Sequence, residues 1–216
     1  MKSQILFSIS IINFIVNLFA IIFLIYLIFE ILNYLIRKVP PVSTSSKNIK
    51  YILEILNKEK REKGLFVDLG CGTAKVLIAV KRKYPKIKVV GYENWPTQFL
   101  LAKIKVFLSK TKIKIFYKDL YQSDLKNADI VFFYLFPHLM VKLKEKLEKE
   151  LKPDVLIICN TFLLPNWQPL YTITTNEKAS DFEKIFVYEK RRSLNKTSLQ
   201  EDRNQKVGEK MFKLQV

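Results

Sequence analysis

The sequence predicts an α/β domain with a mostly parallel sheet, preceded by one N-terminal membrane-spanning helix. From Ser3 to Phe29 the chain carries no charged residue and consists mainly of Ile, Leu, Phe and Val. Further along, short apolar runs alternate with longer amphipathic stretches, as in β-strands that alternate with α-helices. This alternation is typical of parallel βαβ units, in which helices cover both faces of one sheet.

The N-terminal apolar run is long enough to form an uncleaved membrane anchor. An uncharged apolar stretch of more than about 18 residues predicts a membrane span. A cleaved signal peptide is the main alternative, but its apolar region covers only about 7–15 residues and ends in small residues. Here the run is longer and is followed by Glu30, Tyr34, Arg37 and Lys38. We therefore predict a transmembrane anchor over residues 1–38.

The charges that flank this run predict its orientation. Only Lys2 precedes it, whereas Arg37, Lys38, Lys47 and Lys50 follow it. By the positive-inside rule, the domain after the anchor stays on the cytoplasmic side. We therefore expect a single-pass membrane protein that has the lipid bilayer as a partner.

Composition argues against several classes of site. The net charge of +17 suits an anionic surface, although lysines scattered along a chain also arise from a genome rich in A and T. The single histidine, His138, leaves almost no material for a histidine-based zinc site or a Ser-His-Asp triad. Cys71 and Cys159 are isolated in the sequence, so we predict two buried, reduced thiols and no metal site.

The chain divides into four predicted segments. Residues 1–38 form the anchor, 39–46 a linker that contains two prolines, 47–190 the globular domain, and 191–216 a basic tail that we expect to be disordered. Helices of the domain are predicted over Lys47–Lys60, Thr73–Lys83, Pro96–Ser109 and Pro137–Leu151. Parallel strands are predicted over Leu65–Leu69, Lys88–Tyr92, Lys114–Tyr117, Asp129–Leu135 and Val155–Cys159. An antiparallel pair is predicted over Leu170–Thr174 and Lys184–Glu189.

A glycine-rich turn follows the first predicted strand, in the motif Val67-Asp68-Leu69-Gly70-Cys71-Gly72-Thr73-Ala74. In an open α/β sheet, ligands bind beyond the carboxyl ends of the strands. The two glycines permit a tight turn and a close approach of a ligand to the backbone. Asp68, ahead of them, is expected to organise the loop and face a cation such as the amino group of a methionine moiety. A tight turn that binds no ligand is the alternative.

Two further acidic residues follow the next two predicted strands. Glu93 lies roughly 20 residues beyond the glycine turn, where a carboxylate can accept hydrogen bonds from both ribose hydroxyls. Asp119, after the third strand, can accept a hydrogen bond from an adenine amine, and capping of a turn explains it equally well. We assign one set of residues to a nucleotide-type cofactor: Asp68, Gly70, Cys71, Gly72, Glu93, Asn94, Asp119 and Leu120.

With these motifs, the chain resembles the seven-β-strand, S-adenosylmethionine-dependent methyltransferases. Asp68-Leu69-Gly70-Cys71-Gly72 is similar to their first motif and Glu93 to their second. More narrowly, the chain resembles the single-pass membrane protein-lysine methyltransferases of mitochondria, which act on the ATP synthase c subunit or the adenine nucleotide translocase, and their prokaryotic relatives. This narrower resemblance covers roughly residues 5–190. It is carried by the anchor, Val39-Pro40-Pro41-Val42-Ser43-Thr44, Gly91-Tyr92-Glu93, Tyr117-Lys118-Asp119-Leu120, Phe136-Pro137-His138-Leu139-Met140 and Leu164-Pro165-Asn166-Trp167.

The resemblance implies a Rossmann-like, seven-stranded class I methyltransferase sheet, S-adenosylmethionine as cofactor, and methylation of a lysine in a membrane or membrane-proximal protein. Such a lysine must be neutral, and an apolar pocket lowers its pKa from about 10.4. We expect Tyr134, Phe136 and Pro137 to line one wall of this pocket and Trp167 the other. His138 is a candidate base, with a solvent-facing helix start as the alternative, so we predict that His138→Ala lowers turnover only modestly.

The chain also departs from the family pattern. The family carries Gly-Asp-Gly-Arg where this chain has Gly72-Thr73-Ala74-Lys75, and Gln or Glu where this chain has His138. Because Thr73 replaces the acid of the family pattern, a catalytically silent, membrane-tethered cofactor-binding or assembly factor is one alternative function. A methyltransferase for a lipid-like small molecule is a further alternative. Nucleic acid is not an expected partner, because the fourth strand lacks the Asn/Asp-Pro-Pro-Tyr type of motif.

Overall fold

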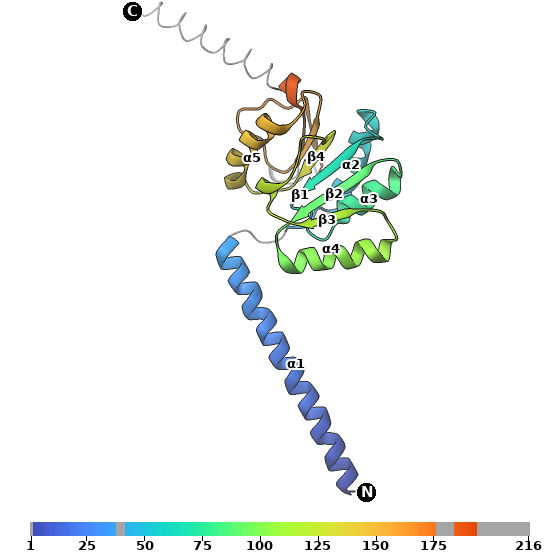
Figure 1. Cartoon of the computed structure of the whole chain (residues 1–216), viewed down its shortest axis with the longest axis vertical. Helices are drawn as coiled ribbons and strands as arrows, with labels where there is room; N and C mark the ends of the chain where they lie inside the picture. Colours follow the sequence, from blue (N-terminus) through green and yellow to red (C-terminus); the bar gives the residue numbers. More distant parts are fainter. Residues whose placement is uncertain (1, 38–41, 176–183, 194–216) are drawn as a thin grey trace, which may run out of the picture. The chain divides into compact units, whose positions relative to one another are not determined.

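The computed structural model describes residues 2–37, 42–175 and 184–193. The chain divides into two compact units, Met1–Pro40 and Pro41–Val216 (Figure 1). The predicted linker lies partly, and the predicted basic tail mostly, outside the described residues.

The first unit is one long helix, α1 (Lys2–Arg37). Its segment Ile9–Leu35 is long and apolar enough to cross a membrane, and the most apolar part of this segment is not buried within the structure. Large apolar side chains such as Phe14 and Phe19 are exposed to the surroundings, as expected of a helix whose partner is lipid. A signal sequence near an N-terminus can also meet these criteria of length and apolar composition, so insertion of α1 into a membrane stays a proposal.

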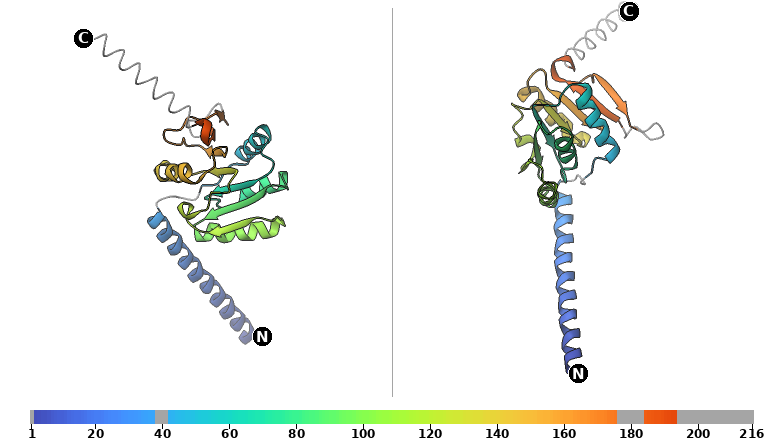
Figure 2. Two further views of the ribbon diagram at one scale, coloured as in Figure 1. Left: turned by 45° about the horizontal axis from the view of Figure 1, so that its top comes forward. Right: turned by 90° about the vertical axis from the view of Figure 1, so that its right-hand side faces the viewer.

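The second unit contains a seven-stranded sheet in the order β3-β2-β1-β4-β5-β7-β6 (Figure 2). The first five strands in chain order pair in parallel, and β7 pairs antiparallel with both β5 and β6. The strands are β1 (Leu65–Leu69), β2 (Lys88–Glu93), β3 (Lys114–Tyr117), β4 (Ile130–Phe133), β5 (Leu156–Asn160), β6 (Tyr171–Thr174) and β7 (Lys184–Glu189). This confirms the predicted α/β class and the antiparallel pair at its end.

Helices cover both faces of the sheet. The remaining elements are α2 (Ser46–Lys58), α3 (Lys75–Lys83), α4 (Pro96–Ser109), the short 3₁₀ helix η1 (Leu120–Gln122) and α5 (Pro137–Glu150). On one face, α2 and α3 pack on apolar side chains such as Phe66 and Phe132. On the other, α5 packs on Val67, Phe133 and their neighbours. The alternation of the two sets along each strand follows from the two-residue repeat of β-structure.

Most predicted bounds differ from the observed ones by one or two residues, and α4, β1, β3 and β7 match. The exception with a physical cause is α3, which begins at Lys75 instead of Thr73. Ala74 adopts a left-handed conformation, with φ 61° and ψ 23°, so the turn after β1 continues to this residue. Helical hydrogen bonding therefore starts later than the apolar pattern indicates.

The order of the strands places a ligand site between β1 and β4. From β1, the chain first builds outward through β2 and β3, and then returns to add β4 and β5 on the other side. At such a switch point the loops after the strands diverge, which leaves room for a ligand beyond their carboxyl ends. The candidate residues follow these strand ends.

Candidate functional site

The turn after β1 is held tightly against the end of β2. The backbone N–H groups of Gly70 and Cys71 both donate to the carbonyl of Tyr92, at 2.9 and 3.0 Å. Gly70 and Gly72 have φ values of 78° and 51°, in the region that favours glycine. A Cβ atom at Gly72 would meet no atom within 4 Å, so open space lies beside the turn.

Glu93 joins the two loops that meet at this edge. One carboxylate oxygen accepts a hydrogen bond from the Gly72 N–H at 2.7 Å, and the other from the Trp95 N–H at 2.8 Å. The side chain is buried, but each carboxylate oxygen can accept more than one hydrogen bond. Glu93 can therefore hold the turn in place and still accept hydroxyl donors of a ligand.

Asp68 is a buried carboxylate on the same side of the sheet as α2 and α3. It is only 2% exposed, and its Oδ1 has no hydrogen-bond partner among the described residues. Burial, and then the negative charge of Glu93, hold the pKa of Asp68 well above its usual value. An unpaired buried carboxylate is unfavourable alone, and a cationic ligand placed against it would remove that cost. This is the arrangement expected of a residue that faces a cation.

Cys71 packs beneath the turn, where only a glycine fits opposite it. A Cβ atom built on Gly91 would lie 2.7 Å from Sγ of Cys71 and 2.5 Å from Cδ1 of Leu77. Burial, followed by the charges of Asp68 and Glu93, raises the pKa of the Cys71 thiol well above its usual value. The thiol therefore stays protonated and acts as a small packing group. Cys159 is also a free, buried thiol, so both cysteines are buried as predicted.

Asn94 and Asp119 lie together at the ends of β2 and β3. The amide of Asn94 donates to Oδ2 of Asp119 at 3.1 Å, and Oδ1 of Asp119 accepts from the Tyr121 N–H at 2.8 Å. Asp119 is thus the N-cap of η1, which is the turn-capping role that the sequence also allowed. Leu120, the first residue of η1, is half-buried against the core on the α5 face. Binding of an adenine amine by Asp119 stays a prediction.

The residues after β4 are arranged at the start of α5. Tyr134 is half-buried and packs against the core on the α2 face. Pro137 is the first residue of α5, and both it and His138 are exposed. The His138 ring stacks on Phe136, with ring centroids 6.2 Å apart. His138 therefore has the solvent-facing position at a helix start.

The structure does not bring Trp167 to this group. Its indole N–H donates to Glu148 at 2.9 Å, and its ring packs edge-on against Tyr188 in the core under α5. Glu148 lies at the end of α5 remote from Pro137. The expectation that Trp167 forms the second wall of the pocket is therefore not supported by its position. The side chain points to the α5 face, a direction that sequence alone does not give.

A pair of buried amides at the end of β5 was not anticipated. Asn160 is the last residue of β5 and only 1% exposed, and its Nδ2 has no hydrogen-bond partner among the described residues. Its Oδ1 accepts from Nδ2 of Asn48, in the first turn of α2, at 2.9 Å. The only signal in the sequence was a polar residue that directly follows the apolar run Val155–Cys159.

The backbone beyond Asn160 is strained. Thr161 has a φ of 76°, which is rare for a β-branched residue, and the Phe162 N–H donates back to the Asn160 carbonyl at 3.0 Å. Strained backbone of this kind costs about 1–3 kcal/mol and occurs often at functional sites. The observation adds the end of β5 to the candidate site.

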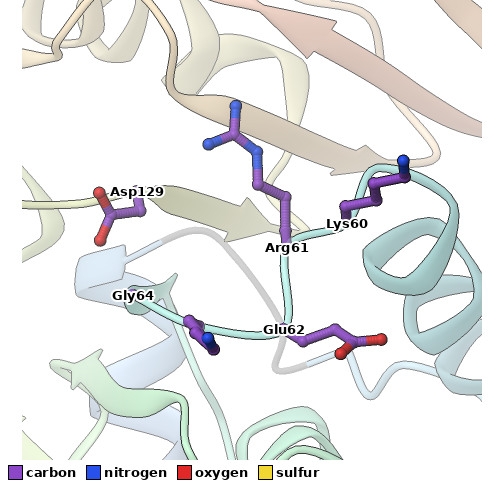
Figure 3. A pocket seen from close by; sticks show the side chains of 6 residues that line it. Lys60, Arg61, Glu62, Gly64 and Asp129 are labelled. Atoms are coloured by element: carbon purple, nitrogen blue, oxygen red, sulfur yellow. The ribbon is translucent and has the colours of Figure 1, made fainter.

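A separate hollow of about 490 Å³ opens at the opposite edge of the sheet (Figure 3). It is lined by the loop from Lys60 to Gly64 and by Asp129, which precede β1 and β4. Oδ2 of Asp129 accepts from the Leu65 N–H at 2.7 Å, and the Arg61 side chain donates to the Asp154 carbonyl at 2.6 Å. These contacts fasten the amino ends of the strands, so this hollow is distinct from the candidate site. Among the described residues, no group of His, Cys, Asp or Glu side chains could hold a metal ion.

Comparisons with known proteins agree with this geometry. A family model described as the ANTKMT methyltransferase domain matches residues 68–171. A protein-lysine N-methyltransferase of Saccharolobus islandicus (strain REY15A) is 28% identical over 141 residues, which cover 64% of this chain and 86% of that protein. The adenine nucleotide translocase lysine N-methyltransferase of Mus musculus and the Homo sapiens lysine N-methyltransferase for the c subunit of ATP synthase are also 28% identical. The matches cover 63% and 62% of this chain but only 58% and 57% of those two proteins.

The fold has a counterpart among solved structures. An RNA methyltransferase from Salinibacter ruber, solved in complex with S-adenosyl-L-homocysteine, superposes with a TM-score of 0.62. The match covers 69% of this chain and 94% of that one, at 22% sequence identity, and it supports the fold alone. The matched segment contains the turn after β1 and Glu93, and it makes this chain similar to the ANTKMT methyltransferase domain and identifies it as an S-adenosylmethionine-dependent methyltransferase.

Proposed function

We propose that this protein is a membrane-anchored methyltransferase that methylates the ε-amine of a lysine in a membrane or membrane-proximal protein. The observation that carries the proposal is the position of two buried side chains at one sheet edge, each with one polar atom that has no hydrogen-bond partner among the described residues. Asp68 is the next-to-last residue of β1, just before the open turn at Gly72, and Asn160 is the last residue of β5. A site with a buried anion on one side and a buried amide on the other suits a cationic methyl donor and an amine acceptor.

The residues around the turn fit S-adenosylmethionine. Asp68 offers an unpaired oxygen to the positive charge of the methionine moiety. Glu93 holds Gly72 through one oxygen and retains acceptor capacity for the ribose hydroxyls. Asn94 and Asp119, hydrogen-bonded to each other, provide polar groups at the next strand end for the adenine amine. When bound, the cofactor supplies an electrophilic methyl group on a sulfonium, and the protein supplies position and electrostatics.

The acceptor side of the site is more apolar. Tyr134 and Phe136, just after β4, are half-buried, and Pro137 adds an exposed apolar surface. Apolar surroundings favour the neutral form of a lysine, which is the nucleophilic form. A neutral lysine held there would be the nucleophile for the methyl group that bound S-adenosylmethionine would supply, and its extra proton would leave to water. No acidic general base is required, in keeping with the exposed position of His138.

The lysine specificity and the membrane location are supported by different facts. The Saccharolobus protein is matched over 86% of its length and is described as a protein-lysine N-methyltransferase. The anchor rests on the apolar segment Ile9–Leu35 and on the basic residues that follow it. A single-pass anchor with the domain on the cytoplasmic side would confine the search to one surface and raise the effective concentration of a membrane substrate.

The proposal is tested with the full chain in native membranes incubated with radiolabelled S-adenosylmethionine, followed by mass spectrometry of the labelled peptides. We expect label on lysines of membrane proteins with the wild-type chain and none with Asp68→Ala. Asp154→Ala, which removes an exposed acid at the opposite sheet edge, is the matched control and should keep full activity. Label found only in extracted lipid would favour a small-molecule substrate. Cofactor binding without any transfer would favour a silent binding factor.

A further inference from the structure

Helix α4 (Pro96–Ser109) has an exposed apolar surface. Phe107 is 82% exposed, Leu108 70% and Leu100 60%, and Leu101 and Ile104 are exposed as well. Soluble domains seldom show such a contiguous group of large apolar side chains without a partner. We call these five residues the outer face of α4.

This face points directly away from the domain. Ala102 is the only buried residue of α4, and the half-buried Phe99 and Val106 pack on the core beside it. At about 100° per residue, Ile104 lies about 160° around the helix from Ala102, and Phe107 and Leu108 lie on either side of Ile104. The helix is thus apolar on both of its sides, one in contact with the sheet and one with the surroundings. In Figure 2, α4 runs along the β3 edge of the sheet, where nothing in the described part of the domain covers its outer side.

The charges around the outer face are all positive. Between Pro96 and Lys118 the chain contains no acidic residue. Lys103 and Lys105 lie on the two flanks of α4, between the outer face and the sheet. Four more lysines follow along the same edge, namely Lys110, Lys112, Lys114 and Lys118, and all four are exposed.

We infer that the outer face of α4 binds the surface of an anionic lipid bilayer, with the helix lying parallel to the membrane plane. An apolar stripe with lysines on its flanks is the pattern of helices that insert into the headgroup region. Apolar burial and attraction to anionic headgroups, worth about 1 kcal/mol for each lysine near the surface, act together there. This inference rests on the proposed membrane location.

The linker between α1 and the domain is short. Only the eight residues 38–45 separate α1 from α2, and eight residues extend over at most about 29 Å. If α1 spans the membrane, the small domain stays next to its surface. A second copy of the chain fits less well, because paired outer faces would bring two sets of lysines together without an acid between them.

Docking through α4 would fix the height of the proposed site, at the carboxyl ends of the parallel strands, above the membrane. The helix begins three residues after Glu93, so its first turn is next to the proposed cofactor site. With α4 flat on the bilayer, the strands antiparallel to it also lie along the membrane plane. The acceptor side would then face laterally over the headgroups, where lysines of membrane-proximal loops are found.

The test uses the full chain in nanodiscs, with an environment-sensitive fluorophore attached at Phe107→Cys. Val141→Cys, at an exposed apolar position on α5, is the matched control, since α5 covers the opposite face of the sheet. The native Cys71 and Cys159 are buried and should not label. Brominated lipids should quench the Phe107 label but not the Val141 label, and more strongly with phosphatidylserine present than with phosphatidylcholine alone. Lys103→Glu combined with Lys105→Glu should remove the dependence on phosphatidylserine.

Equal and weak quenching at both positions would overturn the inference. It would also be overturned if the label at position 107 were shielded by a second copy of the chain, as shown by cross-linked dimers, or were shielded only after a substrate protein is added. Circular dichroism checks that each variant is folded. Quenching needs no methyl transfer, so a failure of lysine methylation leaves this result untouched. Conversely, docking can fail while methylation succeeds.

Discussion

The side-chain amide of Asn48 donates a 2.9 Å hydrogen bond to Oδ1 of Asn160, across 112 residues of sequence. The bond joins the first turn of α2 to the carboxyl end of β5, and Ser45 caps the same turn by accepting from the Asn48 N–H. Exchanging oxygen and nitrogen in both amides keeps the hydrogen bond and places Oδ1 of Asn160 in the unpaired position. An amide oxygen there can accept a hydrogen bond from a lysine amine and orient its lone pair.

Asn160→Ala should therefore lower kcat while leaving the Kd for S-adenosylmethionine unchanged. Loss of one hydrogen bond to the developing ammonium should slow turnover by about 10–100-fold. Asn57→Ala, an exposed position on α2, is the control. Steady-state kinetics and calorimetry separate the two effects. If Asn160 had a purely structural role, Asn160→Ala would have reduced thermal stability and an unchanged kcat in its folded fraction.

Asp68→Asn should raise the stability of the cofactor-free protein at neutral pH. The substitution keeps the shape of the side chain but removes a carboxyl whose ionised form is disfavoured by burial and by the charge of Glu93. Residues placed for ligands commonly reduce stability in this way. Thermal unfolding with and without S-adenosylmethionine measures the effect, and the variant should lose most of the stabilisation by ligand. A lower melting temperature without ligand would argue that Asp68 is a structural residue.

The raised pKa of Asp68 predicts a proton released on cofactor binding. In the folded, ligand-free state the carboxyl binds its proton more tightly than in the unfolded state. Stability of that state should thus fall as pH rises from the ordinary carboxyl pKa, near 3.9, to the raised value. A bound cation favours the ionised form, so affinity should increase with pH over the same range and then level off. Calorimetry in buffers of different ionisation enthalpy detects the proton, and Asp68→Asn should abolish its release.

Replacing two glycines by alanine, one at a time, should separate effects on folding from effects on cofactor binding. Gly91→Ala forces a Cβ against Cys71 and Leu77, and should cost about 1–3 kcal/mol of stability. Gly72→Ala meets no atom within 4 Å, so its main effects are a modest backbone strain and intrusion into the space beside the turn. We expect Gly72→Ala to fold well and to bind S-adenosylmethionine poorly. Denaturant titrations and equilibrium binding measure both, and normal binding by Gly72→Ala would exclude that space as part of the site.

Trp167→Phe should affect stability and leave catalysis intact. The change keeps the ring in the core under α5 and removes the hydrogen bond to Glu148, at a cost of about 1 kcal/mol. Turnover in the folded protein should match that of the wild type. A large loss of kcat without a loss of stability would restore Trp167 to the acceptor pocket.

Local sequence patterns were sufficient for the elements and for part of the site. Runs such as Leu65–Leu69 are strands because each is short, apolar and bounded by turn-forming residues. Asp68, Glu93 and Asp119 could be proposed together because the carboxyl ends of parallel strands meet at one edge. The hydrogen bonds from Gly72 to Glu93 and from Asn94 to Asp119 agree with this placement.

Features that depend on side-chain direction or on distant contacts were not predictable. Asn48 and Asn160 come together only because α2 packs over the end of β5. Trp167 follows β5 closely in sequence, yet its ring turns to the α5 face. In α4, apolar residues occur on all sides, so periodicity could not indicate which of them would be left outside the core.

The central claim, that Asp68 and Glu93 hold one adenosyl ligand at the end of β1 and β2, is tested most directly by titration calorimetry of the full chain with S-adenosylmethionine. We predict measurable binding to the wild type and none to Asp68→Ala or to Glu93→Ala, with both variants folded. Unchanged affinity in both variants would contradict the assignment of this site.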